Sequence, residues 1–286
     1  MSTKEEALKK AMEQMEGLKG RVESLQKAVE KAVRKTLEGD LPPEEAGGTS
    51  LSWETPEEPF REGKVPVETL FPKESRYSLE WYSGIHSLAI NIKRKVGEGK
   101  KGAVLFTSSV PGEGTTTLCS NVSLALARVL AGNVLLLDCN ARHPEIHKLF
   151  NTESIPGLTD ILMEKINWEE AIRKTTLKNY YVLPFGQSLQ DPWSLLGSVA
   201  MEGLLNVLKV DFDFIFLDAP PILEWTGAEM IVPWVEAAVL IIKAHSTRRE
   251  VVMRAAERII DRREFIGAIL NQQKWFTTRF LNKGHR

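Results

Sequence analysis

The stretch AVLFTSSVPGEGTTT, residues 103–117, joins an apolar run to a glycine-rich loop and then to the start of a helical segment. This order matters because the backbone N–H groups of such a loop and the N-terminus of the following helix together attract anions. We expect the N–H groups of Gly112, Glu113 and Gly114 to form an anion-binding nest. The stretch therefore predicts a phosphate-binding loop after the first strand of an α/β domain.

The loop departs from the phosphate-binding pattern GxxxxGK[ST] at the lysine. Ser109 stands at the first glycine and Gly114 at the second. Thr116 occupies the position of the magnesium-binding hydroxyl, but Thr115 replaces the lysine. A charge-assisted contact of this kind contributes about 1.5 to 3 kcal/mol, so nucleotide affinity is expected to fall by about one to two powers of ten. Hydrolysis or transfer is expected to suffer more, because the lysine also follows the charge of the transferred phosphate.

Two interpretations of the loop remain open. The nest survives without the lysine and could still hold ATP or ADP with Mg²⁺, although weakly. Alternatively, nucleotide binding is lost and the glycines serve only a tight turn. Lys100 and Lys101 precede the strand, so they lie at the wrong end of the sheet to replace the missing charge. The predicted nucleotide-binding residues of the loop are Pro111, Gly112, Glu113, Gly114, Thr115, Thr116 and Thr117.

The rest of the domain alternates between apolar runs and helical segments such as Thr117 to Leu130 and Arg248 to Ile260. Strands that are apolar throughout are typical of a parallel sheet covered by helices on both faces. We therefore predict a P-loop NTPase-like α/β fold with a mostly parallel sheet. The expected strands are Ala103 to Thr107, Val134 to Asp138, Tyr181 to Leu183, Phe214 to Asp218, Ala237 to Ile242 and Phe265 to Leu270.

Polar residues follow three of these strands at the edge where ligands of such sheets bind. Asp138 and Asp218 are placed to hold Mg²⁺ or its waters together with Thr116, although a capping role for either is the alternative. Arg142 follows Asp138 in the same loop, and these two residues and Asp218 are the candidates for catalysis. Asn271 is placed to contact a nucleotide base or to form a turn.

Other parts of the chain have different compositions. Residues 1–38 carry apolar residues at steps of three and four, which predicts a coiled-coil-like helix that pairs, stays solvated or lies on a membrane. Residues 39–77 are rich in proline, glycine and glutamate and are predicted to be a flexible linker. The α/β domain is expected over 78–273, beginning with a helix that packs on the first strand. The tail, 274–286, is predicted to be either a docking segment or disordered.

Composition narrows the class of protein. The chain has 286 residues, with 37 Lys and Arg against 38 Asp and Glu, a balance that does not favour nucleic-acid binding. Cys119 and Cys139 lie in apolar runs and are expected to be small core residues of a protein in a reducing compartment. No apolar run is long enough for a spanning helix. We therefore expect a cytoplasmic protein.

From Ser78 to Gln273 the chain resembles the bacterial tyrosine kinase family, cytoplasmic P-loop ATPases and autokinases that regulate capsule and exopolysaccharide synthesis. The resemblance is carried by TSSVPGEGTTT for Walker A, LLLDCNARHP for Walker A′ and DFIFLDAPP for Walker B, with PGLTDIL, VLPFG and GAILN between and after them. It implies a nucleotide site and partners such as a membrane polysaccharide co-polymerase, an active kinase paralogue or a second copy of the chain bound through the N-terminal helix.

The sequence departs from the family pattern at the positions that handle metal, nucleotide and phosphate acceptors. Beyond Thr115, Asn140 replaces the second Walker A′ aspartate and Gly227 stands where the family usually has aspartate. No tyrosine follows Tyr181, whereas the family ends in a tyrosine cluster. The family's ring-forming ExxRxxR motif is also missing from its expected positions, Ser83, His86 and Ala89.

These departures predict a degenerate member that acts as a non-phosphorylating regulatory or scaffold subunit, recruited to the inner face of the membrane by a partner. One alternative is a slow ATPase or a tyrosine kinase completed in trans by a partner's basic residue. A second is a membrane-associated positioning switch similar to the MinD and ParA ATPases.

Overall fold

The computed structural model describes residues 67, 78–97, 101–224, 226–261 and 265–272. The predicted N-terminal helix over 1–38, the tail over 274–286 and, apart from Val67, the linker over 39–77 lie outside these residues. Those three predictions therefore stay predictions. None of the described helices is both long enough and apolar enough to cross a membrane.

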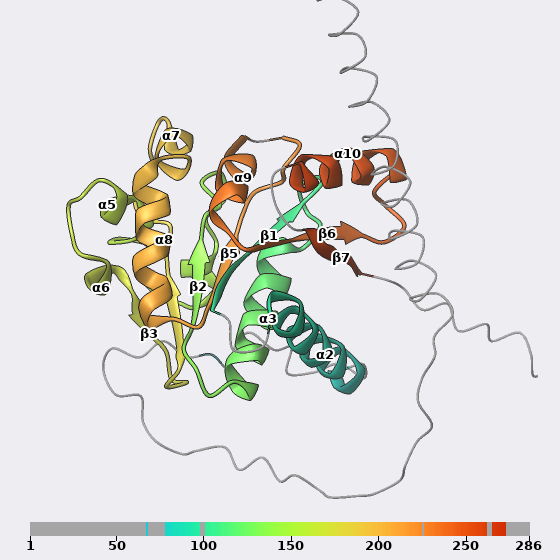
Figure 1. Cartoon of the computed structure of the whole chain (residues 1–286), viewed down its shortest axis with the longest axis horizontal. Coiled ribbons are helices and arrows are strands. Elements are labelled where there is room, and N and C mark those ends of the chain that lie inside the picture. The colour runs from blue at the N-terminus through green and yellow to red at the C-terminus, as the bar shows by residue number, and fades with distance from the viewer. Residues whose placement is uncertain (1–66, 68–77, 98–100, 225, 262–264, 273–286) are drawn as a thin grey trace, which may run out of the picture. The chain divides into compact units, whose positions relative to one another are not determined.

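A seven-stranded sheet forms the centre of the domain, in the order β3-β4-β2-β5-β1-β6-β7 (Figure 1). Every neighbouring pair is parallel except β3 and β4. The phosphate-loop strand β1 lies between β5 and β6, well inside the sheet. The strands are β1 (Gly102–Ser108), β2 (Val134–Asp138), β3 (Arg173–Lys174), β4 (Tyr180–Leu183), β5 (Phe214–Asp218), β6 (Ala237–Lys243) and β7 (Phe265–Asn271).

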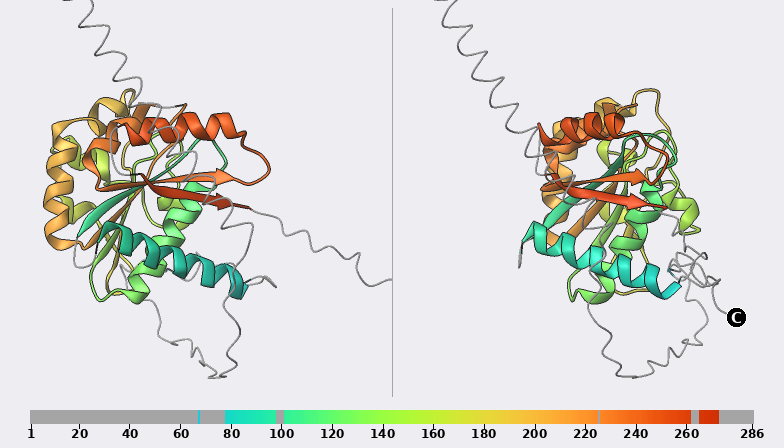
Figure 2. Two further views of the ribbon diagram at one scale, coloured as in Figure 1. Left: turned by 45° about the vertical axis from the view of Figure 1, so that its right-hand side comes forward. Right: turned by 90° about the vertical axis from the view of Figure 1, so that its right-hand side faces the viewer.

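Helices cover both faces of the sheet, as Figures 1 and 2 show. On one face α3 packs against β1, β2 and β5, and α2 packs against α3. On the other face α8 contacts β1 and β5, while α10 contacts β6 and β7. In the described part of the chain the helices are α2 (Ser78–Val96), α3 (Thr115–Val129), α4 (Ile146–Leu149), α5 (Leu158–Leu162), α6 (Trp168–Ala171), α7 (Pro192–Leu196), α8 (Val199–Asp211), α9 (Thr226–Ile231), the 3-10 helix η2 (Val232–Trp234) and α10 (Arg249–Ile260).

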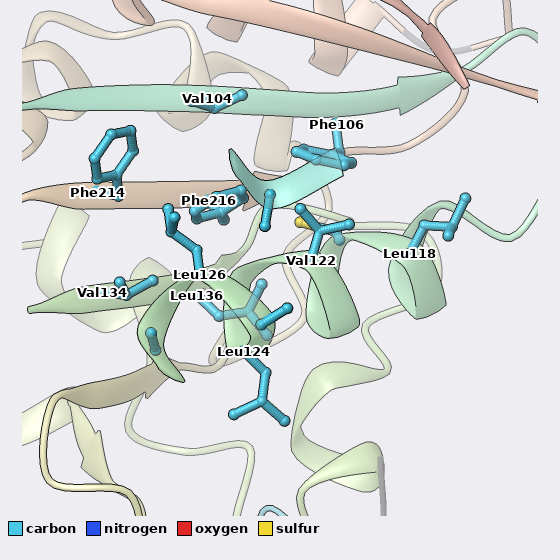
Figure 3. Packing of buried hydrophobic residues seen from close by; sticks show 14 of the residues in the cluster. Val104, Phe106, Leu118, Val122, Leu124, Leu126, Val134, Leu136, Phe214 and Phe216 are labelled. Carbon is cyan, nitrogen blue, oxygen red and sulfur yellow. The ribbon is translucent and has the colours of Figure 1, made fainter. Parts of the chain in front are cut away.

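A hydrophobic core lies between the sheet and α3 (Figure 3). Phe106 of β1 and Phe216 of β5 are fully buried, with ring centroids 5.7 Å apart. Val122 and Leu126 of α3 pack onto the same cluster. The strands alternate side chains between two buried faces, which is why they are apolar at almost every position.

The predicted strands agree with the observed ones to within one or two residues, and the fold class is confirmed. The two-residue antiparallel strand β3 was not predicted. The first helix of the domain forms as expected but packs mainly on α3 rather than directly on the first strand. Cys119 and Cys139 are buried and unpaired, as predicted for core residues.

Two of the sequence blocks, PGLTDIL and VLPFG, pack against each other beside the sheet. Leu158 and Thr159 donate backbone hydrogen bonds to the carbonyls of Pro184 and Phe185, at 2.8 and 2.9 Å. At the N-cap of α5, a Cβ on Gly157 would lie 2.3 Å from the backbone nitrogen of Gly186. Only glycine allows this close approach.

We therefore expect Gly157→Ala to lower the free energy of unfolding by about 1 to 3 kcal/mol, because backbone atoms would have to move. Gly84→Ala is the matched control: it lies on the exposed face of α2 with nothing within 4 Å of the added Cβ. That change should raise the free energy of unfolding by about 0.5 to 1 kcal/mol. Urea denaturation measures both, and equal midpoints for the two variants would contradict this packing.

Candidate functional site

The phosphate loop runs from the end of β1 to the start of α3. Gly112 and Gly114 have φ of 77° and 89°, left-handed values that favour glycine. Gly114 is the N-cap of α3 and offers no side chain, and the first turn of α3 carries no acidic residue. The first N–H groups of α3 are therefore not neutralised by a local carboxylate, which is the arrangement of an anion-binding helix N-terminus.

The Glu113 carboxylate lies buried inside the loop. Its Oε2 accepts hydrogen bonds from the backbone nitrogens of Ser109 and Val110, at 2.7 and 3.0 Å. Its Oε1 accepts one from the Lys243 nitrogen at 2.9 Å and another from the Thr247 hydroxyl. Glu113 thus ties the loop to itself and to the segment between β6 and α10. The sequence predicted only a backbone role for this residue.

Asn271, at the end of β7, contacts the loop from the other side. Its Nδ2 donates to the carbonyl of Glu113 at 2.7 Å, and a Cβ on Gly114 would lie 2.4 Å from the same nitrogen. Its Oδ1 accepts from the backbone nitrogen of Gln272 at 2.8 Å. The amide therefore braces the loop, and its contact with a nucleotide base stays a prediction.

Asp138 and Asp218 lie in register on the neighbouring strands β2 and β5, and both are fully buried. Asp138 accepts hydrogen bonds from the backbone nitrogens of Asn140 and Ile146, at 3.0 and 3.1 Å. Burial raises its pKa from 3.8 to about 7, although these bonds lower it. The structure thus brings the two predicted carboxylates together at the carboxyl end of the sheet.

Asp218 is the less satisfied of the pair. Among the described residues, no donor completes a hydrogen bond to either of its carboxylate oxygens. Burial, and then the charge of Asp138, raise its pKa well above 3.8, while the Thr116 hydroxyl approaches and partly offsets the increase. Buried oxygens without donors are unusual in folded proteins and indicate a group that a ligand or ion completes.

The donor set fits Mg²⁺. Two buried carboxylates and the Thr116 hydroxyl offer oxygen ligands only, which hard cations prefer, and Mg²⁺ keeps several waters when bound. The described residues include no group of three or more His, Cys, Asp and Glu side chains that could hold a metal ion, so the remaining ligands of Mg²⁺ would be the Thr116 hydroxyl, waters and phosphate oxygens. Bound there, the ion would neutralise negative charge on phosphate oxygens, and Thr116, Asp138 and Asp218 would hold it or its waters.

The loop after β2 carries two further residues from the sequence analysis. The Oδ1 of Asn140 accepts a hydrogen bond from the His143 nitrogen at 3.2 Å, so this side chain stabilises the turn. Arg142 is exposed in the same turn. A role for Arg142 in catalysis therefore stays a prediction.

Gly227, where the family pattern has aspartate, is buried in α9. A Cβ there would lie 2.1 Å from the Trp193 ring of α7, so a larger side chain requires this ring to move. The packing of Trp193 gives a structural reason for glycine at this position. No sequence pattern connects these two residues, which lie 34 positions apart.

Together, the glycine-rich loop, the open N-terminus of α3 and the paired carboxylates define a P-loop NTPase-like domain of the α/β class. Residues 104–250 match the family described as an AAA domain. The chain is 32% identical over 173 residues to the tyrosine-protein kinase YwqD of Bacillus subtilis, covering 60% of this chain and 73% of that protein. The chain therefore belongs to the bacterial tyrosine kinase family.

Solved structures agree with this assignment. The kinase domain of VpsO superposes with a TM-score of 0.61 at 26% identity, covering 70% of this chain and all of that domain. The septum site-determining protein MinD of Pyrococcus horikoshii, solved with Mg-ADP, shares the fold with a TM-score of 0.51 at 24% identity. The MinD match covers 59% of this chain and 69% of that one.

The unsatisfied carboxylate predicts how stability depends on pH. The native state retains a proton on Asp218 at pH values where the unfolded chain, with a pKa near 3.8, has released it. The stability of the natural chain should therefore fall as pH rises above about 4 through the raised pKa values of the pair, with that of Asp138 about 7. Asp218→Asn removes the charge without losing an accepted hydrogen bond.

We expect Asp218→Asn to raise the free energy of unfolding at pH 8 and to change it little near pH 3, where the carboxyl is protonated in both states, measured by urea denaturation without Mg²⁺. Asp211→Asn, at an exposed position, is the control and should leave the pH profile unchanged. A parallel shift of the Asp218→Asn profile at both pH values would show that the charge of Asp218 is not the cause.

Glu113→Gln tests the buried carboxylate of the loop. The amide must place an NH₂ group against one pair of donors, so the variant should lose about 1 to 3 kcal/mol of stability. Glu257→Gln on the exposed face of α10 is the matched control and should change stability by less than about 0.5 kcal/mol. If both variants unfold at the same urea concentration, the four bonds to Glu113 do not hold the loop.

Proposed function

We propose that this chain is a non-phosphorylating, nucleotide-binding regulatory subunit of an exopolysaccharide or capsule assembly system. The observation that carries the proposal is Thr115 at the lysine position of a loop that keeps Gly114, the Thr116 hydroxyl and an open helix N-terminus. An open α3 N-terminus and a buried carboxylate pair support binding of ATP or ADP with Mg²⁺. Without the lysine, the loop lacks the cation that stabilises the charge on the transferred phosphate.

The tyrosines support the same proposal. Tyrosine autophosphorylation needs accessible tyrosine hydroxyls, and no tyrosine follows Tyr181 in this sequence. Tyr180 is fully buried, with its hydroxyl 2.8 Å from the Ser123 hydroxyl, so it does not reach an active site in another subunit. Regulation would then pass through contacts with a partner, either a membrane polysaccharide co-polymerase or an active kinase paralogue at the inner face of the membrane.

A second candidate is a slow ATPase completed in trans by a basic residue of a partner. Asp218 favours it, because an ionisable group held buried without donors is costly unless it serves metal or proton chemistry. The two functions differ in turnover. In the ATPase, phosphate release depends on Asp138 and Asp218, whereas the regulatory subunit binds nucleotide without releasing phosphate.

We expect the purified chain to bind Mg-ATP or Mg-ADP weakly by calorimetry and Thr115→Lys to tighten binding by about 10- to 100-fold. Incubation with Mg-ATP should leave tyrosine unphosphorylated by mass spectrometry. Thr152→Lys, at a partly buried threonine outside the loop, is the control and should leave the affinity unchanged.

Autophosphorylation of the purified chain would overturn the regulatory proposal. Phosphate release by the natural chain that disappears in Asp218→Asn would favour the slow ATPase instead. If neither nucleotide binds the natural chain while Thr115→Lys binds both, the nucleotide-binding part of the proposal fails and only the scaffold role remains.

A further inference from the structure

Lys243 is the last residue of β6 and lies directly beside the phosphate loop. Its backbone nitrogen donates to Glu113 Oε1 at 2.9 Å. Strand β6 is the neighbour of β1, with Ile241 in register with Ser108, the last residue of β1. Lys243 therefore stands two residues further along, at the height of the loop itself.

The alternation of β6 indicates the direction of the Lys243 side chain. Val239 and Ile241 belong to the core cluster that includes α3. Side chains two residues apart in a strand leave the same face of the sheet, so Lys243 projects toward the face covered by α3. The N-terminus of α3, at Thr115, follows immediately after the loop on this face.

Asn271 provides an independent check on this direction. Lys243 and Asn271 are in register in the parallel pair of β6 and β7, so their side chains leave the same face. The Asn271 amide reaches the carbonyl of Glu113, at 2.7 Å. Because β6 lies between β1 and β7, Lys243 is one strand closer to β1 than the side chain that already contacts the loop.

The charge of Lys243 is available for a ligand. The Lys243 side chain is half-buried. It forms no ion pair with any acidic residue that the structure describes. The adjacent Glu113 carboxylate already accepts four hydrogen bonds. By contrast, Lys209 pairs with Glu236 at 2.6 Å, and Lys101 lies 4.0 Å from Asp213.

We propose that Lys243 supplies the cationic contact to nucleotide phosphate that Thr115 cannot provide. The inference rests on the proposed nucleotide binding and names a residue that serves it. A lysine ammonium is a compact charge on a flexible stem, so it can reach a phosphate oxygen from a neighbouring strand as well as from the loop. The Lys243 ammonium would approach the phosphate from the end of β6, whereas the usual lysine approaches it from the phosphate loop.

The test is equilibrium binding of Mg-ATP and Mg-ADP to the full chain carrying Lys243→Met, which keeps the stem and removes the charge. We expect affinity to fall about tenfold or more and to depend less on salt. Lys243→Arg should bind nearly as tightly as the natural chain. Lys174→Met, on the edge strand β3, is the exposed-lysine control and should bind normally.

Thermal unfolding of each variant identifies any that fail to fold, and Lys243→Gln then replaces the methionine variant. If folded Lys243→Met or Lys243→Gln binds nucleotide as tightly as the natural chain, the inference is overturned while the proposed function stands.

The same substitution in the Thr115→Lys background separates the two proposals. If the natural chain binds no nucleotide, the proposed binding function fails, and the Thr115→Lys chain still reports on Lys243. Weaker binding by the double variant than by Thr115→Lys alone supports the phosphate contact, and equal binding overturns it.

Discussion

The burial of Asp138 and Asp218 side by side is the constraint on which the site depends. Parallel pairing of β2 with β5 brings the two carboxylates into register, and the backbone continues the pairing, with the Cys139 nitrogen donating to the Asp218 carbonyl at 2.8 Å. Two acidic groups this deep in the sheet oppose folding at neutral pH, because each must lose its hydration or keep its proton. An apolar pair would stabilise the strands better, so we expect that the two aspartates are retained for binding a ligand or an ion.

The phosphate loop holds a buried acidic residue of its own. The Glu113 carboxylate accepts hydrogen bonds from the backbone nitrogens of Ser109, Val110 and Lys243 and from the Thr247 hydroxyl. With the bond from Asn271, the loop is joined to the ends of β6 and β7 as well as to β1. The loop is therefore held by its neighbours in the sheet.

The parts of this site that the sequence predicted are those set by backbone order. Asp138 and Asp218 each end an apolar strand, and parallel strands bring their carboxyl ends to one edge, so their proximity follows from the pattern. Two features of the site depend on packing between segments far apart in sequence: the side-chain role of Glu113 and the contact between Gly227 and Trp193. The periodicity of the sequence does not predict such contacts. Strand β3 was missed for a related reason, since two residues are too short to show a pattern.

The departures from the family pattern differ in how deeply they are built into the fold. Thr115 is partly exposed at the first position of α3. Gly227 is buried, and the Trp193 ring fills the space that an aspartate side chain would need. A lysine at position 115 would thus restore one charge of the family pattern, whereas an aspartate at position 227 would still clash with the Trp193 ring. The backbone and oxygen groups proposed to bind phosphate and metal are retained, and this combination is the basis for proposing a domain that binds nucleotide without transferring phosphate.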